Sequence, residues 1–194
     1  MQDDRFEYLV GERAEKPRDC GLTFVIGEAM TLGGTRTLAD LLEWAGPWFD
    51  WYKFVYSGFP LQDPALVERK LEMLAEHGVE GFPGGNFLEI AAAEGVADRF
   101  LADVAAVGFD RVEVSTTVVD LAREEKSELI ETARQEGLAV HAEVGKKQSE
   151  GADALSIADA IAEMEADLAA GADAVVFESE AVEAVLEGEG ADES

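Results

Sequence analysis

The sequence predicts an α/β fold of the (β/α) TIM-barrel type, with about six β/α units. Short apolar segments start at residues 21, 51, 79, 109, 139 and 173, so the steps between them are 30, 28, 30, 30 and 34 residues. Amphipathic helical patterns lie between most of these segments. Because the repeat lacks a Rossmann glycine fingerprint, a barrel is favoured over an open flavodoxin-like sheet, which is the alternative.

Each predicted strand is a short apolar run. The six runs are Gly21–Gly27, Trp51–Ser57, Val79–Gly85, Phe109–Ser115, Ala139–Gly145 and Asp173–Ser179. Apolar residues at helical spacing predict helices over Pro64–His77, Ala97–Val107, Glu124–Glu136 and Ile157–Ala170. The glycines that follow or end these patterns, Gly78, Gly108, Gly137 and Gly171, suit the left-handed position that ends a helix.

The predicted barrel is incomplete. The acidic tail, residues 180–194, has too little apolar length for two further β/α units. We therefore expect residues 1–194 to form a single barrel-like domain that includes this short tail. Sheet edges are normally paired or covered, so a homo-oligomer that completes the barrel is one expectation.

The composition is strongly acidic. The 42 acidic and 15 basic residues give a formal net charge of −27, which disfavours nucleic acid and anionic membranes as partners. Acidity on this scale suggests adaptation to a high-salt cytoplasm, where roughly molar salt shortens the Debye length to about 3 Å. Cys20 is the only cysteine, so neither a disulfide nor a thiolate zinc site is expected. With no signal pattern and no long apolar run, we expect a soluble cytoplasmic protein.

Three glutamates occupy the same place in successive predicted strands. Glu113, Glu143 and Glu178 are fifth or sixth in their segments, and inward carboxylates at one level can bind Mg²⁺. For any single glutamate, the alternative is a salt bridge to a neighbouring Lys or Arg.

Basic and small residues also gather at predicted strand ends. Three of the six lysines, Lys53, Lys146 and Lys147, lie within or just after a strand. Gly84 and Gly85 lead into a helix and offer backbone N–H groups to an anion, although a glycine pair is often only a turn. Ser115 ends the fourth strand, and Lys16 and Arg18 precede the first.

Several motifs together resemble the phosphosulfolactate synthase family. They are KPRDCGLTFVIGEAM (16–30), DWYKFVYSG (50–58), PGGNFLE (83–89), GFDRVEVS (108–115) and EVGKK (143–147), in the family's order and spacing. The first and last are the specific ones. The chain is thus identified as a divergent, C-terminally shortened member, with a halophilic archaeon as the expected source.

The resemblance implies an Mg²⁺-dependent (β/α) barrel lyase that adds sulfite to phosphoenolpyruvate to give 2-phospho-3-sulfolactate, a step toward coenzyme M. It implies Lys147 or Lys146 as the general acid, with Lys53 as a further catalytic, anion-binding lysine. Glu113, Glu143 and Glu178 become the metal-side residues. The implied substrate-binding residues are Lys16, Arg18, Gly84, Gly85 and Ser115. The alternative is a non-catalytic relative, a partial barrel that binds a small anion or a partner chain.

Overall fold

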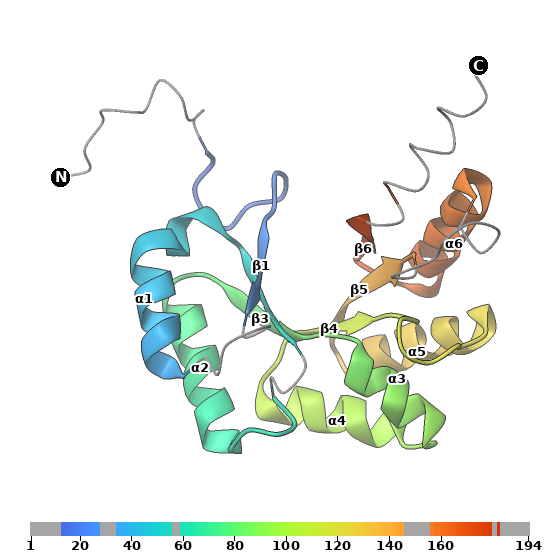
Figure 1. The fold of residues 1–194 in the computed structure, drawn as a ribbon, viewed down its shortest axis with the longest axis horizontal. Helices are drawn as coiled ribbons and strands as arrows, with labels where there is room; N and C mark the ends of the chain where they lie inside the picture. Colours follow the sequence, from blue (N-terminus) through green and yellow to red (C-terminus); the bar gives the residue numbers. More distant parts are fainter. Residues whose placement is uncertain (1–12, 28–33, 56–58, 146–155, 180–181, 183–194) are drawn as a thin grey trace.

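The computed structural model describes residues 13–27, 34–55, 59–145, 156–179 and 182, and it has the predicted β/α order (Figure 1). The strands are β1 (Phe24–Gly27), β2 (Trp51–Phe54), β3 (Glu80–Pro83), β4 (Arg111–Val114), β5 (Ala139–Val144) and β6 (Ala174–Phe177). The helices are α1 (Thr35–Ala45), the short 3-10 helix η2 (Gly46–Trp48), α2 (Pro64–Glu76), α3 (Asn86–Ala93), α4 (Ala97–Val107), α5 (Arg123–Gln135) and α6 (Ile157–Ala170).

The strands form one arc of two parallel sheets. In the first sheet β2 pairs with β1 and β3, and in the second β5 pairs with β4 and β6. The two sheets meet where β3 packs beside β4. Figure 1 shows the helices on the outside of this arc. Among the described strands, β1 and β6 are the outer ends of the arc and do not pair with each other, so the described barrel is open, as the sequence predicted.

Local sequence signals explain where the helices begin and end. Asp63 caps α2 by accepting a hydrogen bond from the Ala65 N–H at 3.0 Å, and Pro64 supplies the first helical residue. The four glycines expected at helix ends all have positive φ, from 61° at Gly78 to 110° at Gly171. The helix-to-strand turns therefore follow the glycine pattern.

The structure also differs from the sequence-based boundaries. Every strand is shorter than predicted; β1, for example, begins at Phe24, and Gly21, with a φ of 62°, lies outside the extended region. Helix α1 had no predicted counterpart. Apart from Val182, the acidic tail lies outside the described residues, as do Lys146 and Lys147.

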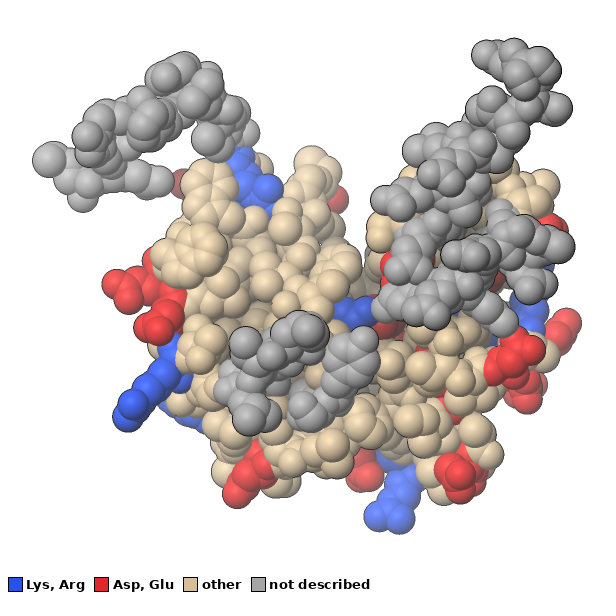
Figure 2. Space-filling view, viewed as in Figure 1, with Lys and Arg blue, Asp and Glu red and all other residues tan. Residues whose placement is uncertain are grey.

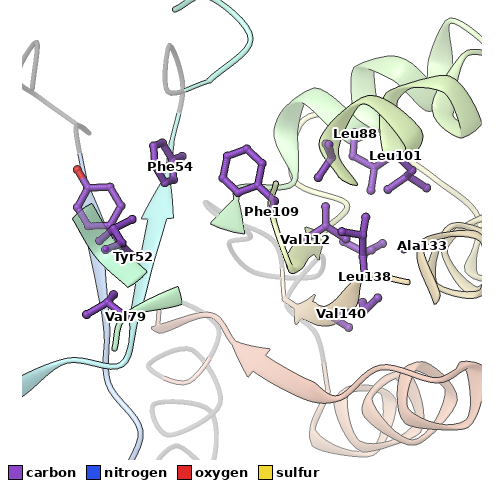
Figure 3. Close-up of a cluster of buried hydrophobic side chains, with 14 of the residues drawn as sticks. Tyr52, Phe54, Val79, Leu88, Leu101, Phe109, Val112, Ala133, Leu138 and Val140 are labelled. Atoms are coloured by element: carbon purple, nitrogen blue, oxygen red, sulfur yellow. The ribbon is translucent and has the colours of Figure 1, made fainter. Parts of the chain in front are cut away.

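The core lies between the arc and its helices. Side chains alternate along each strand, so Tyr52 and Phe54 of β2 point toward the helices while Lys53 points to the inner side. Figure 3 shows the buried cluster that this alternation builds, including Phe54, Leu101, Val112 and Val140. Close burial on the helix side fixes the register of the strands and thereby fixes which residues face inward.

The inner side carries two layers. Nearer the amino ends of the strands, the His141 ring packs 4.5 Å from the Trp51 ring and 4.9 Å from the Phe82 ring, measured between centroids. Nearer the carboxyl ends, the inward residues are charged.

None of the described helices is long and apolar enough to cross a membrane.

Candidate active site at the carboxyl ends of the strands

Lys53 and two glutamates form a buried charged cluster on the inner side of the arc. The Lys53 Nζ lies 2.6 Å from Oε2 of Glu113 and 3.5 Å from Oε2 of Glu143. The three side chains come from β2, β4 and β5, and their exposed fractions are 10%, 3% and 3%. We call Lys53, Glu113 and Glu143 the carboxyl-end cluster. Figure 2 shows basic and acidic atoms in contact in a hollow between the two halves of this face.

Glu113 is held from two sides. Its Oε1 accepts a hydrogen bond from the Gly85 N–H at 3.0 Å, and its Oε2 faces the Lys53 ammonium. Burial raises the pKa of Glu113 above its ordinary value, and the nearby Glu143 charge adds to the rise, whereas Lys53 and the Gly85 N–H oppose it. The balance of these effects makes Glu113 harder to ionise than an exposed glutamate.

Glu143 is fixed by Thr117, in the segment that follows β4, and by Lys126 of α5. The Thr117 hydroxyl donates to its Oε1 at 2.9 Å, and the buried Lys126 ammonium donates to its backbone carbonyl at 2.8 Å. Lys126 also contacts Glu163 at 2.8 Å and Asp167 at 2.7 Å, so three acceptors share its ammonium. Lys126 thus anchors the carboxyl end of β5.

A cavity of about 180 Å³ adjoins the cluster. Lys53, Glu113, Gly84 and Asn86 provide its polar wall, and aromatic rings that include Phe59 and Phe87 provide its apolar wall. Because an ordered water needs only about 10–15 Å³ of such space, the cavity admits a small organic molecule. A small cavity with one ammonium and mixed walls suits a compact anion with an apolar part.

Gly84 and Gly85 are needed for close packing. A Cβ on Gly84 would lie 3.0 Å from Cε of Lys53, and one on Gly85 would overlap the Ser115 hydroxyl. The Gly85 N–H, which the sequence assigned to a substrate anion, instead binds the Glu113 carboxylate. Both glycines therefore lie at the cluster, where they shape it.

Ser115 points away from the cavity. Its side chain is buried, and its hydroxyl donates to Oε1 of Glu89, a buried residue on α3. Sequence reasoning placed Glu89 and Thr117 near strand ends without giving them a role, and it did not single out Lys126. Glu89 belongs to the PGGNFLE motif, which was the available signal, whereas nothing near Lys126 or Thr117 in the sequence indicated their partners.

Lys16 and Arg18 lie at the other end of the strands. Lys16 donates to the Gly46 carbonyl at 2.7 Å and to the His77 carbonyl at 3.2 Å. Gly46 precedes β2 and His77 precedes β3, so both carbonyls lie at the amino ends of strands. Arg18 forms an ion pair with Asp50 at 2.6 Å, immediately before β2. The structure therefore does not bring these two cations together with Lys53.

The predicted three-glutamate metal site does not fit the described geometry. Glu113 and Glu143 both direct an oxygen at Lys53, and Glu178 follows β6, two residues beyond Val176, the partner of Glu143 in the ladder. In the part of the chain that the structure describes, no three His, Cys, Asp or Glu side chains gather into a metal-binding group. The third charged side chain beside Glu113 and Glu143 is Lys53, and not a third carboxylate.

Comparison with known proteins agrees with the motifs. Residues 11–191 match the family model for (2R)-phospho-3-sulfolactate synthase (ComA). A phosphosulfolactate synthase of Methanothermobacter thermautotrophicus is 35% identical over 90% of this chain and 66% of its own length. The Methanocaldococcus jannaschii enzyme of that name is 33% identical over 81% and 62%, respectively. The chain thus spans slightly under two thirds of the length of these relatives.

Solved structures agree on the fold. A 2,3-dimethylmalate lyase superposes with a TM-score of 0.53 at 14% identity, covering 87% of this chain and 61% of that one. Deoxyribose phosphate aldolase from Aeropyrum pernix gives 0.51 at 20% identity, covering 87% and 68%. Both likenesses support a TIM-barrel-type β/α arrangement. The family match over residues 11–191 and the two named relatives lead to one conclusion: this chain belongs to the phosphosulfolactate synthase family.

Proposed function

We propose that this chain adds sulfite to phosphoenolpyruvate at the carboxyl-end cluster, giving 2-phospho-3-sulfolactate. The observation that carries the proposal is the Lys53 ammonium, which is nearly buried yet lines a cavity. In a chain of net charge −27, a lysine kept at this place suits anionic substrates. The names of the relatives supply the reaction class.

The proposed reaction balances without an oxidant or reductant. The sulfur lone pair of sulfite forms a bond to the methylene carbon of phosphoenolpyruvate, and the electrons of the double bond move toward the carboxylate. A proton then adds to the carbon that bears the phosphate ester. The phosphate ester stays intact, so the product is a phosphorylated sulfonate.

In this proposal, Lys53 stabilises the charge that develops on the substrate carboxylate. An ammonium fixed in a water-poor site stabilises such a charge more strongly than water does. Glu113 and Glu143 hold Lys53 in place through contacts of 2.6 Å and 3.5 Å to its ammonium. The apolar wall with Phe59 and Phe87 would receive the methylene end.

The other parts of the proposal come from the family resemblance. Lys147 or Lys146 would give the proton, and both lie outside the described residues. Gly84 and Gly85 would contribute by shaping the site, whereas Lys16, Arg18 and Ser115 have structural partners instead. The described carboxylates Glu113 and Glu143 contact Lys53. Magnesium therefore enters the proposal only through the family resemblance, and it is included in the assay for that reason. A cytoplasmic location, a high-salt habitat and a homo-oligomer stay predictions.

The test is incubation with phosphoenolpyruvate, sulfite and Mg²⁺ in molar salt, followed by ³¹P NMR. We expect the phosphoenolpyruvate signal to disappear only when sulfite is present, with a new phosphate ester signal replacing it. A folded sample without turnover at any salt concentration would contradict the proposal. Saturable binding of phosphoenolpyruvate without turnover would instead support the non-catalytic alternative.

A further inference from the structure

Glu89 is a buried carboxylate that the proposed reaction does not use. Its side chain is fully buried in the first turn of α3, and among the described residues no Lys or Arg forms an ion pair with it. A buried carboxylate is costly unless hydrogen bonds compensate it. Within the described part of the chain, its carboxylate accepts four hydrogen bonds, all from one segment, residues 115–119, which follows β4.

The four donors use both oxygens of Glu89. Oε1 accepts from the Ser115 hydroxyl and from the Thr117 N–H at 2.9 Å. Oε2 accepts from the Val118 N–H at 2.6 Å and the Val119 N–H at 2.8 Å. Three consecutive backbone amides bound to one carboxylate fix the path of this segment. Charge-assisted hydrogen bonds of this kind are about twice as strong as neutral ones.

The fixed segment carries the residue that holds Glu143. Thr117 receives its backbone position from Glu89 and donates its hydroxyl to Oε1 of Glu143 at 2.9 Å. The other oxygen of Glu143 lies 3.5 Å from the Lys53 ammonium. A continuous series of contacts therefore leads from Glu89 through Thr117 and Glu143 to Lys53.

The same helical turn also reaches the second partner of Lys53. The Glu89 N–H donates to the Gly85 carbonyl at 2.9 Å, and the Gly85 N–H donates to Glu113 at 3.0 Å. Glu113 in turn lies 2.6 Å from Lys53. Both carboxylates that orient Lys53 are thus tied to the start of α3, one through the backbone and one through the Glu89 side chain.

We propose that Glu89 is a positioning residue: by holding residues 115–119 it lets Thr117 fix Glu143 against Lys53. The inference deepens the proposed function, on which it rests for the role of Lys53 toward substrate. Its structural part, the dependence of Lys53 on Glu89 through Thr117, does not require turnover.

The experiment compares Glu89→Gln with Thr117→Val in the full chain. The matched control is Glu94→Gln, which changes an exposed glutamate at the end of the same helix. Hydrogen exchange reports on the amides of residues 117–119, and acetic anhydride labelling with mass spectrometry reports on Lys53. Steady-state kinetics separates kcat from KM.

For Glu89→Gln we expect faster exchange at residues 117–119 and about fivefold faster acylation of Lys53, the ratio that corresponds to one net hydrogen bond of about 1 kcal/mol. For Thr117→Val we expect the same acylation change with exchange at Val118 and Val119 unaltered. Both variants should lower kcat more than they raise KM, and Glu94→Gln should change none of these values.

Unchanged Lys53 acylation in Thr117→Val would overturn the inference, and so would faster loop exchange in Glu89→Gln without a change at Lys53. If Glu89→Gln does not fold, Thr117→Val decides alone. If the unmodified chain has no turnover, the proposed function fails, while acylation and exchange still decide the positioning role.

Discussion

The two ends of the strands each carry a buried charged cluster, and the clusters differ in what they leave available. At the amino ends, Arg18 contacts Asp50 at 2.6 Å and also donates to the carbonyls of Ala14 and Pro47. At the carboxyl ends, the Lys53 ammonium has carboxylate neighbours and adjoins a cavity. The first arrangement uses cations to join segments of backbone, and the second leaves a cation beside open space.

The pKa values of Asp50 and Glu113, one carboxyl group from each cluster, are shifted in opposite directions. Burial opposes ionisation of Asp50, but hydrogen bonds from the Thr23 N–H and Arg18 outweigh it, so its pKa lies below the ordinary value. Burial dominates at Glu113, and its pKa rises. A carboxylate that stays ionised strengthens a structural ion pair, whereas one that resists ionisation suits a site for anions.

The largest expected effect is the loss of activity on replacing Lys53. Lys53→Met should reduce kcat/KM by about 10²–10³, the cost of removing one fixed group that stabilises developing charge. The ³¹P NMR assay in molar salt measures the change, with circular dichroism to confirm folding. A folded Lys53→Met variant with more than a third of the original activity would show that the carboxyl-end cluster is not the reaction site.

The next effect is on stability at the amino ends. Asp50→Ala should lower the free energy of unfolding by about 2–3 kcal/mol, because Arg18 and the Thr23 N–H lose charge-assisted hydrogen bonds. Urea unfolding measures it. Asp110→Ala is the matched control, since Asp110 is an exposed aspartate that precedes β4 as Asp50 precedes β2. Equal losses in the two variants would remove the structural role given to Asp50.

His141, in the aromatic layer nearer the amino ends of the strands, should make stability depend on pH. Burial lowers its pKa to about 3, and the Arg111 guanidinium, whose Nη1 lies 3.1 Å from Nε2, contributes. The unfolded chain binds a proton near the ordinary pKa of about 6.5, so stability falls as pH drops from there toward 3. Through His141, the free energy of unfolding should change by up to about 1.4 kcal/mol per pH unit, the slope expected when the unfolded chain binds one more proton than the folded chain.

The check is urea unfolding of the original chain and of His141→Gln between pH 7 and pH 4.5. The difference between the two free energies should shrink as the pH falls, because only the original chain loses stability through this residue. A difference that stays constant over this range would mean that His141 binds its proton equally well in the folded chain.

The smallest effect is expected for Lys16. Lys16→Met should leave kcat/KM within about twofold, because the ammonium donates to two backbone carbonyls at the amino ends and not to the cavity. The free energy of unfolding of this variant should fall by about 1 kcal/mol, because those hydrogen bonds are lost. A large rise in KM for phosphoenolpyruvate would instead return Lys16 to the substrate-binding set and erase the contrast between the two ends.

The sequence predicted the β/α order well because strand and helix periodicity and helix-ending glycines are local signals. It also predicted that Lys53, Glu113 and Glu143 would face the same region, since strand-end position and alternation are enough for that. It could not predict that Lys53 would separate the two glutamates, because that depends on the register between β2, β4 and β5. The substrate-binding role of Lys16 and Arg18 came from the family resemblance, and their contacts with Gly46, His77 and Asp50 depend on long-range packing that the sequence does not display.

Differential protection of Lys53 and Lys16 tests the central claim most directly. The chain would be acylated with acetic anhydride in molar salt, with and without phosphoenolpyruvate, and both lysines quantified by mass spectrometry. We predict that phosphoenolpyruvate slows acylation of Lys53 and leaves Lys16 unchanged. Protection of Lys16 instead, or saturable phosphoenolpyruvate binding that leaves Lys53 unprotected, would contradict the assignment of substrate to the carboxyl-end cluster.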